Sequence, residues 1–512
     1  MYDAIAVGSG LGGLTAAALT AKAGGKVLVL EKNPGFGGAA GTYPRAGRRF
    51  EISLHETTRP EVPGDPKGAV FAALGLSERV AFVPIETFQE VRTPLLDGSV
   101  RLGGGLAGVE TALRRVLPDM GDEIAGFLGQ IGRTLEAIEA MSVRHDGAWW
   151  RGHAADLPLD LWAVIRDMGS SLSEVMSRHF GHIELPKLLL AANLPYYTDD
   201  PDRFWWLGYA VAQGFFLQHG GHYVKGGSGA LVEALVAIIE EGGGTCRSGA
   251  TVTRLLTGDD HAIRGVEWRD AGGTLHTELA PVVFGNAAPE RLSEMLPEGP
   301  GQALHQAQGS AAPSISLFEI SYALACPGRD LGITSYSTTL LPEWMLMLDD
   351  FRAASGLLGH PPADRMPPLI VVDYGQIDSG LADGVPAPVS ATGVDRLANW
   401  AGLSAADYAG RKADWVAAIT ARLDAEWPGF AAAVDSAEMA TARTMQDWLG
   451  TPGGAVYGYA PDVPEHPFRG PESRVETPVP GLFLASAWGG MGGYTGAMGA
   501  GAEAARRALR RR

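Results

Sequence analysis

Two short apolar runs near the start of the chain enclose a stretch with helical character. Residues 3–7 (DAIAV) and 26–30 (KVLVL) are almost continuously apolar and contain β-branched side chains, which is typical of strands buried on both faces of a parallel sheet. Between them, residues 14–23 are rich in alanine and end at two glycines, as expected of a helix that stops there. The pattern predicts a strand–helix–strand unit with parallel strands.

Later segments carry both helical and strand-like patterns. Residues 124–140 and 161–180 place apolar side chains at helical spacing, whereas residues 251–256 alternate and residues 281–285 form another apolar run. This mixture predicts an α/β fold in which a Rossmann-type domain is combined with a mixed α+β domain.

A glycine-rich turn joins the first predicted strand to the helix. Its sequence, GSGLGG at residues 8–13, matches the GxGxxG pattern of dinucleotide-binding proteins. In that pattern the first glycine allows a tight turn, the second lets the backbone approach a pyrophosphate, and the last lets helix and strand pack closely. The helix N-terminus then faces the phosphates, and Glu31, after the second strand, can accept hydrogen bonds from ribose hydroxyls. The residues predicted to bind the nucleotide are Gly8, Gly10, Leu11, Gly12, Gly13, Glu31 and Lys32.

A second glycine-rich loop follows Glu31 almost at once. Residues 35–42 read GFGGAAGT, and a loop of this kind so soon after the acid indicates a ligand that extends past the first turn. FAD is long enough to need such a second contact, so we expect FAD here, with Gly37, Gly38, Ala39 and Thr42 as contacts. Another match, at residues 103–108, lacks the flanking buried strands, so no separate NAD(P) domain is predicted.

Composition excludes several classes of function. The 512 residues are 46% hydrophobic and 19% charged, which predicts a folded globular chain. The net charge of −17 argues against nucleic acid as a partner. Two cysteines without a CxxC pattern exclude a disulfide framework or cysteine-rich zinc site and indicate a cytoplasmic protein. No metal-ligand spacing and no HExxH, GxSxG or Walker A motif occurs, so no metal site is expected.

One uncharged segment raises the question of a membrane. Residues 204–224 contain no Asp, Glu, Lys or Arg over about the length that a bilayer requires. Glutamines, histidines and glycines interrupt the segment, which favours a buried helix over a surface-lying helix or channel mouth, and either over a true span. The chain is therefore expected to be cytoplasmic, with contact to a membrane surface left open.

Several distant segments together resemble one flavoprotein family. Residues 37–42 (GGAAGT), 50–55 (FEISLH), 225–235 (KGGSGALVEAL) and 480–498 are similar to sequences in the flavoproteins related to bacterial phytoene desaturase, carotenoid isomerase and retinol saturase. The resemblance implies a GR2-like FAD-binding domain built from residues 1–90, 225–300 and 445–512. A substrate domain with a helical subdomain, from residues 91–224 and 301–444, would be interleaved with it.

The same resemblance implies further FAD contacts. Relatives contact the adenine through the backbone around the position of Val252 and place the last helix against the flavin ring. Many relatives have an acid that bonds the ribityl chain where this sequence has Ser486 and Ala487, which is a departure from the pattern. The contacts implied are Val252, Ser486, Gly493, Tyr494, Thr495 and Met498.

The activity implied is FAD-dependent hydride transfer to a polyene or other long apolar substrate, by desaturation, saturation or redox-neutral isomerisation. An amine-oxidase-like flavoenzyme and a non-catalytic lipid carrier of the same fold are the alternatives. The direction of hydride transfer and the electron donor or acceptor stay open. The candidate catalytic residues are His55, Glu56, Tyr457 and Tyr494, with Arg45 and Tyr459 as further polar groups near the flavin.

An aromatic-rich region suggests where an apolar substrate would bind. Its tryptophan and phenylalanine side chains could line a tunnel for a long hydrocarbon, or could equally be core residues. The residues concerned are Trp149, Trp150, Trp162, Trp205, Trp206, Phe215 and Phe216.

Overall fold

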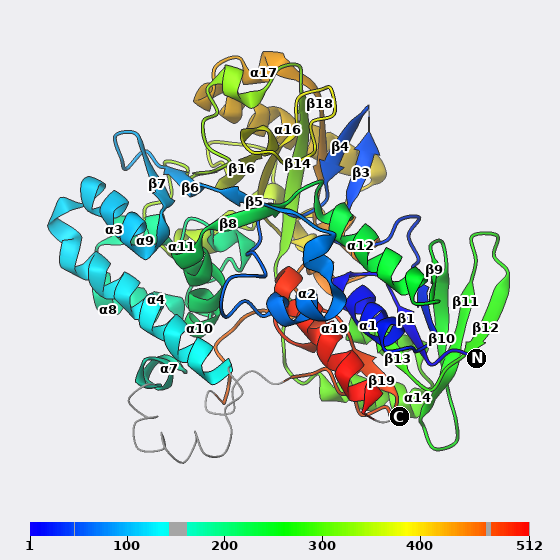
Figure 1. Ribbon diagram of the computed structural model, residues 1–512. Helices are drawn as coiled ribbons and strands as arrows, with labels where there is room; N and C mark the ends of the chain where they lie inside the picture. Colours follow the sequence, from blue (N-terminus) through cyan, green and yellow to red (C-terminus); the bar gives the residue numbers. More distant parts are fainter. Residues whose placement is uncertain (46, 143–160, 467–472, 511–512) are drawn as a thin grey trace.

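A parallel sheet of five strands lies at one end of the protein (Figure 1). The computed structural model describes residues 1–45, 47–142, 161–466 and 473–510. The strand order is β19-β13-β1-β2-β9, and every neighbouring pair is parallel. The strands are β1 (Ala4–Val7), β2 (Val27–Leu30), β9 (Thr245–Arg247), β13 (Val283–Gly285) and β19 (Leu482–Leu484).

Successive side chains of β1 and β2 point to opposite faces of this sheet and enter two different cores. One face of the sheet is covered by the helices α1 (Leu11–Lys22), α12 (Ser228–Glu241) and α19 (Gly493–Leu509). The strand residues that pack on this face are Ala4, Ala6, Val27 and Val29. Ile5, Val7, Leu28 and Leu30 pack on the opposite side against an antiparallel three-stranded sheet. That sheet consists of β10 (Thr251–Thr257), β11 (Ile263–Arg269) and β12 (Leu275–Leu279).

A second, seven-stranded sheet forms the centre of the substrate region, in the order β18-β14-β17-β16-β15-β6-β7. The long helix α16 (Ala405–Glu426) covers it through Trp415, Ile419 and Leu423, which lie in one core with the strand residues. The strands are β6 (Thr87–Arg92), β7 (Ser99–Gly103), β14 (Ser316–Leu324), β15 (Ser337–Leu340), β16 (Leu369–Asp373), β17 (Val389–Asp395) and β18 (Val434–Ala440).

Short elements connect the two regions. The hairpin of β3 (Thr42–Arg45) and β4 (Arg48–Glu51) precedes α2 (Lys67–Leu74), and β5 (Phe82–Ile85) pairs antiparallel with β8 (Gly221–Val224). All strands of the five- and three-stranded sheets fall within the ranges expected for the FAD-binding domain, whereas β6 crosses the expected boundary at residue 90. The division into domains stays a prediction.

Other α-helices lie outside the helical subdomain. They are α13 (Pro289–Met295), α14 (Glu298–Ala307), α15 (Asp350–Ala354), α17 (Phe430–Ala433) and α18 (Ala442–Leu449).

A helical subdomain fills the other end of the protein (Figure 1). The helix expected over residues 161–180 is two helices, because Ser171 caps a new one and forms a capping box with Glu174. The uncharged segment is helical from Trp206 to His219, includes a π-helical turn at Ala210–Gly214, and continues into β8. The helices are α3 (Gly105–Val116), α4 (Gly121–Ser142), α7 (Trp162–Asp167), α8 (Leu172–Phe180), α9 (Glu184–Leu190), α10 (Trp206–Tyr209) and α11 (Phe215–His219).

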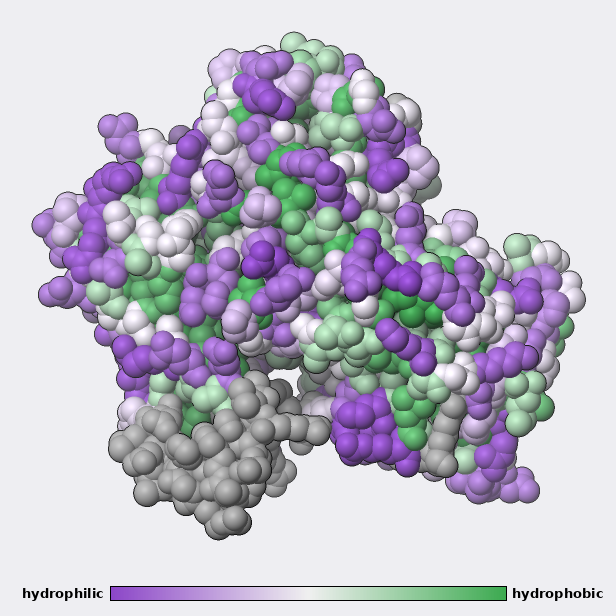
Figure 2. Space-filling view, viewed as in Figure 1, coloured by the Kyte–Doolittle hydropathy of each residue, from purple (hydrophilic) through white to green (hydrophobic). Residues whose placement is uncertain are grey.

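The structure bears on the membrane prediction. None of the helices within the described ranges is both long and apolar enough to cross a bilayer. On the face drawn in Figure 2, the hydrophobic residues among those coloured lie in separate areas bounded by hydrophilic ones.

The structure places the members of the predicted aromatic tunnel in different surroundings. Trp206 is fully buried and packs against Phe127 with 5.5 Å between ring centroids, so it is a core residue. Trp162 is 57% exposed on the surface. Phe215 and Phe216 are partly buried, and Phe216 stacks on Phe88 at 5.3 Å. Trp205 donates its indole N–H to the Met168 carbonyl, and Trp149 and Trp150 lie outside the described residues.

Candidate functional site

The site begins at the carboxyl end of β1, where the chain turns into α1. Gly8 has a φ of 97°, a left-handed conformation that favours glycine. No side chain caps α1 at Gly10, so the amides of the first turn are left for a ligand or solvent. This is the arrangement expected of an anion-binding turn.

Asn286 supports this turn from the end of β13. Its Oδ1 accepts a hydrogen bond from the Gly10 N–H at 2.7 Å, and its Nδ2 donates to the Ala485 carbonyl at 2.6 Å. A Cβ on Gly10 would lie 2.5 Å from the same Oδ1. The observed reason for glycine at position 10 is therefore the Asn286 side chain, whereas its expected contact with a pyrophosphate stays a prediction.

The other two glycines of the turn allow close packing. A Cβ on Gly13 would lie 2.5 Å from the Gly8 carbonyl oxygen, which is the helix–strand contact expected of this glycine. A Cβ on Gly12 would lie 2.3 Å from the Ala485 carbonyl oxygen, and Leu11 is buried.

Glu31 lies at the end of β2, beside this turn. Its Oε2 accepts from the Ser9 N–H at 2.9 Å and the Ser9 hydroxyl at 2.7 Å, and its Oε1 accepts from the Asn33 N–H at 2.8 Å. An ionised carboxylate has about four lone-pair positions, so it can still accept from a ribose hydroxyl. The Glu31 carbonyl also accepts from the Ala250 N–H at 2.7 Å, which brings Val252 and the start of β10 to the same end of the sheet.

Lys32 is not held toward this site. Its side chain is exposed, and its Nζ donates to the Asp447 carbonyl in α18 at 3.0 Å. Binding of the nucleotide by this side chain is therefore not supported by its position.

The second glycine loop lies directly against the first. The Gly37 N–H donates to the Ser9 hydroxyl at 3.0 Å, and Gly10 and Gly37 form a parallel bridge. The Gly38 carbonyl accepts from the Trp448 indole N–H at 2.9 Å. The remaining predicted contacts of this loop are anchored as well: the Ala39 carbonyl accepts from the Ser53 hydroxyl at 2.7 Å, and a Cβ on Gly229 would lie 2.6 Å from the Thr42 hydroxyl.

Helix α19 reaches the same region from the far end of the sequence. It begins at Gly493, whose φ is 74°, and no side chain caps it. The Tyr494 hydroxyl lies 3.2 Å from the Ser53 hydroxyl, and a Cβ on Gly492 would lie 2.7 Å from the Tyr457 Cβ. The predicted residues Tyr457 and Tyr494 are thus brought to one helix terminus.

Ser486 and Met498 are engaged within the protein. The Ser486 hydroxyl accepts from the Trp488 N–H at 3.3 Å, and the Met498 side chain is fully buried. Any contact of Met498 with a cofactor would therefore be made by its backbone.

A buried ion pair holds the first turn of α19. The Lys67 ammonium donates to the Thr495 hydroxyl at 3.0 Å and to an Asp65 carboxylate oxygen at 2.9 Å. Burial lowers the pKa of Lys67, and the neighbouring Asp65 opposes that change.

Three tyrosines fix the segment that contains His55. The Tyr374 hydroxyl donates to the Leu54 carbonyl at 3.0 Å, the Tyr336 hydroxyl donates to the His55 carbonyl, and the Tyr196 hydroxyl lies 2.5 Å from His55 Nδ1. His55 Nε2 lies 3.3 Å from the Ser390 hydroxyl and 3.7 Å from a Glu319 carboxylate oxygen. His55 therefore has a partner at each ring nitrogen and joins this segment to the seven-stranded sheet.

Glu56 is placed differently from its neighbour. Its Oε2 is buried and has no hydrogen-bond partner among the described residues. Burial raises the pKa of Glu56 to about 8, so the carboxyl is mainly protonated at pH 7. A neutral acid in an otherwise tyrosine-rich setting is able to donate a proton.

Two further polar candidates lie elsewhere. Arg45 is exposed on the β3–β4 hairpin and pairs with Glu438. Tyr459 packs edge-on against Trp488 at 4.9 Å and bonds to Gln308. Neither contact supports the expected role near a flavin.

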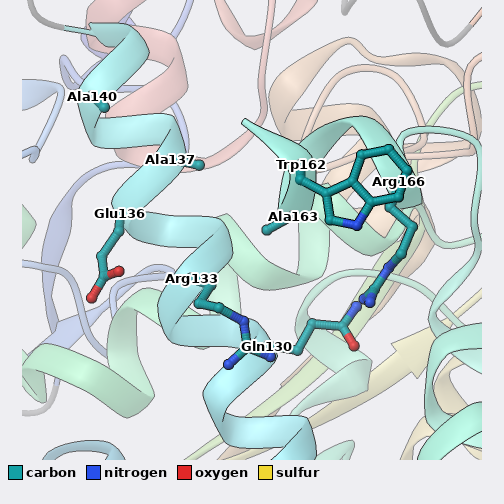
Figure 3. Close-up of a pocket in the computed structure, with 8 residues that line it drawn as sticks. All are labelled: Gln130, Arg133, Glu136, Ala137, Ala140, Trp162, Ala163 and Arg166. Atoms are coloured by element: carbon teal, nitrogen blue, oxygen red, sulfur yellow. The ribbon is translucent and has the colours of Figure 1, made fainter. Parts of the chain in front are cut away.

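A surface hollow of about 390 Å³ lies between α4 and α7 (Figure 3). Arg133, Arg166, Gln130 and the exposed Trp162 are among its lining residues. It belongs to the helical subdomain, at the opposite end of the protein from the parallel sheet, so it is not part of this site.

Sequence reasoning missed Asn286, Lys67 and the three tyrosines. Asn286 could have been found, because it directly follows an apolar run and ligands of parallel sheets bind at the carboxyl ends of the strands. Lys67 and the tyrosines carry no local motif, and only tertiary structure brings them to the site.

Comparison with known proteins agrees with this geometry. A family model described as an NAD(P)-binding Rossmann-like domain matches residues 7–61. All-trans-retinol 13,14-reductase of Homo sapiens is 24% identical over 94% of this chain and 81% of its own length. Phytoene desaturase (neurosporene-forming) of Rhodobacter capsulatus is 26% identical over 56% of this chain and 52% of its own. Chloroplastic prolycopene isomerase of Daucus carota is 55% identical over 10% of this chain and 8% of its own.

Solved structures with the same fold cover nearly the whole chain. An oxidoreductase from Methanosarcina mazei has a TM-score of 0.60 and 17% identity, covering 97% of this chain and 98% of its own. A triple mutant of putrescine oxidase has a TM-score of 0.65 and 16% identity, covering 100% of this chain and 99% of its own. Identities this low show the fold alone.

The fold and the site define an oxidoreductase with a Rossmann-type dinucleotide-binding domain. Its sequence is similar to those of proteins named retinol 13,14-reductase, phytoene desaturase and prolycopene isomerase. The predicted fold class is confirmed, and these relatives agree with the predicted resemblance.

Proposed function

We propose that this protein binds FAD and transfers hydride to or from a polyene or another long apolar substrate. The observation that carries the proposal is that the second glycine loop contacts the starts of two uncapped helices: Gly37 bonds Ser9 before α1, and Ala39 bonds Ser53, whose hydroxyl lies 3.2 Å from that of Tyr494 in α19. Glu31 accepts from Ser9 beside the first of these helices. Two such termini suit a long ligand with an anionic centre and an electron-accepting end.

In this proposal, different residues of the chain bind different parts of the cofactor. The first-turn amides of α1 would bind the pyrophosphate, Glu31 the ribose, and the backbone near Val252 the adenine. Residues 37–39, Ser486 and the first turn of α19 would surround the flavin end. When bound, the flavin ring supplies hydride transfer, which the protein side chains cannot perform.

The side chains near the reacting end would orient the substrate and exclude water. Tyr457 and Tyr494 lie at the start of α19, and burial raises the pKa of both above the usual value, so they remain neutral donors.

The names of the relatives support a polyene as the substrate, because retinol, prolycopene and phytoene are long unsaturated molecules. Both cysteines of the chain are free thiols, which supports a cytoplasmic setting, from which such substrates would be collected at a membrane surface.

The test is anaerobic spectroscopy of the purified protein. We expect a yellow preparation with an oxidised-flavin spectrum that retains FAD through gel filtration. Phytoene should bleach the oxidised form, or all-trans-retinol should reoxidise the dithionite-reduced form, whereas putrescine should do neither. Bleaching by putrescine alone would assign an amine-oxidase activity, and a folded protein that stays colourless with excess FAD would overturn the proposal.

A glycine variant tests the placement of the cofactor. Gly10→Leu should lose FAD, because its side chain would displace Asn286 and fill the space before α1. Gly35→Ala is the control, since a Cβ there meets nothing within 4 Å. Equal FAD retention by both variants would contradict binding at this turn.

A further inference from the structure

Glu56 carries a buried carboxyl oxygen that has no hydrogen-bond partner in the described part of the chain. A Cβ built on Gly221 would lie 3.2 Å from Glu56 Oε2, 3.3 Å from Ile85 Cδ1 and 3.5 Å from Phe88 Cδ2. The carboxyl therefore lies beside apolar and aromatic groups at the β5–β8 ribbon, where Phe216 of the helical subdomain stacks on Phe88. A buried polar atom without a partner needs an explanation, and a reacting group is one.

The backbone on both sides of Glu56 is fixed. Before it, tyrosine hydroxyls bond the carbonyls of Leu54 and His55. After it, Thr57 and His222 exchange two backbone hydrogen bonds of 2.8 Å. A carboxyl on so rigid a segment cannot easily turn toward another partner, so its position is pre-organised.

The titratable groups near Glu56 place no positive charge beside it. Tyr196, Tyr197 and Tyr336 have raised pKa values because of burial, with the Glu56 charge as the next cause. On β8, burial lowers the pKa of His222, so that ring is neutral as well. Two further charged groups pair with other residues: a Glu319 carboxylate oxygen lies 3.7 Å from His55 Nε2, and the Lys67 ammonium lies 2.9 Å from Asp65. Burial alone raises the pKa of Glu56, and no cation among the described residues opposes it.

We propose that Glu56 is the acid that supplies the proton when a conjugated carbon–carbon double bond is saturated at this site. The inference rests on the proposed function and adds the direction of the reaction. Tyr494 links the two, because it lies in the first turn of α19 and its hydroxyl is 3.2 Å from that of Ser53, three residues before Glu56.

The step balances as a two-electron reduction. The reduced flavin would supply a hydride, which would form a C–H bond at one carbon of the double bond. The π electrons would take the Glu56 proton and form the second C–H bond at the other carbon. Glu56 would be left as a carboxylate and would regain a proton from water, and the flavin would have given up two electrons.

The test compares Glu56→Gln with wild-type protein, each loaded with FAD, reduced with dithionite and mixed anaerobically with all-trans-retinol. Glu61→Gln, an exposed carboxyl on the same loop, is the control. We expect Glu56→Gln to slow flavin reoxidation by about 10²- to 10⁴-fold, the usual contribution of a general acid. The wild-type rate should fall above pH 8, and the residual rate of the variant should not depend on pH. In D2O the wild-type product should carry deuterium at both carbons of the former double bond, because the transferable hydrogen of reduced flavin also exchanges with solvent.

A second measurement needs no turnover. Infrared difference spectra of wild type minus Glu56→Gln should contain a protonated carboxyl band at pH 7 that disappears with a midpoint near pH 8. Absence of this band, or reoxidation of Glu56→Gln at the wild-type rate and pH profile, would overturn the role of Glu56. If retinol fails to reoxidise wild-type flavin while the band is present, the choice of substrate fails and the protonated acid stands.

Discussion

At the scale of single residues, two glutamates on one segment, Glu51 and the partly buried Glu56, differ in their surroundings. Glu51 accepts from the Ser228 N–H at 2.8 Å, the Ser228 hydroxyl at 2.5 Å and the Tyr223 hydroxyl at 3.0 Å. Glu56 Oε2 accepts from no described residue. Burial raises the pKa of both, but donors oppose the change only at Glu51. Glu51 therefore joins the loop at residues 226–229 to the β3–β4 hairpin. Glu56 has no such structural contact, which is consistent with its proposed role as a proton donor.

A second residue-scale prediction concerns Asn286. Asn286→Ala would leave the Gly10 N–H and the Ala485 carbonyl without their partner, at a cost of about 1–3 kcal/mol for an unsatisfied buried group. We expect the free energy of unfolding to fall by that amount in urea titrations and FAD retention to weaken. Asn286→Asp keeps the acceptor for the Gly10 N–H but places a second acceptor oxygen against the Ala485 carbonyl, so it should also lower the free energy of unfolding. Unchanged stability of Asn286→Ala would contradict this role.

At the scale of elements, α1 and α19 touch through glycine. A Cβ on Gly501 would lie 2.1 Å from the Gly12 carbonyl oxygen, a backbone atom that cannot move without shifting the helix. This contact sets the distance between the two helix N-termini that the proposed cofactor would bridge.

Gly501→Ala should therefore separate the helices. Overpacking of this kind costs about 1–3 kcal/mol, and FAD should be released more readily from the variant. Gly499→Ala is a matched control on the same helix, since a Cβ there meets nothing within 4 Å and alanine favours helix by about 1 kcal/mol. Thermal unfolding with and without FAD measures both effects, and equal behaviour of the two variants would contradict the close contact.

How much of the fold and the site could be predicted from the sequence depends on how far apart the contacting residues lie in the chain. The strands and helix around residues 8–13 depend on local patterns, so β1, α1 and β2 were predictable within a few residues. The break between α7 and α8 was also readable, because Ser171 and Glu174 have the spacing of a capping box. The tyrosines that bond Leu54 and His55 lie 141 to 320 residues away, and no local pattern announces contacts of that range.

At the scale of the whole molecule, the parallel sheet is assembled from the beginning, the middle and the end of the chain. Its outer strand β19 pairs with β13, and α19 then covers the sheet through Met498, Ala504 and Ala508. The site is complete only when all these segments are in place.

A chain ending at residue 479 tests this dependence. Loss of β19 and α19 would expose the apolar face of α1 and the free edge of β13, so we expect aggregation and no FAD binding, measured by gel filtration and absorbance. A chain ending at residue 509 is the control and should remain folded and yellow. A monomeric, FAD-retaining chain of 479 residues would contradict the shared sheet.

The position of β19 also has a consequence for biosynthesis. The ribosome makes residues 482–484 after nearly all of the remaining chain, so β13 emerges about 200 residues before its outer neighbour exists. Over that interval, at about 5–20 residues per second, the nascent protein carries an unpaired strand edge for on the order of ten seconds or more. Chaperones that shield exposed strand edges during translation should therefore govern how much of this enzyme a cell accumulates.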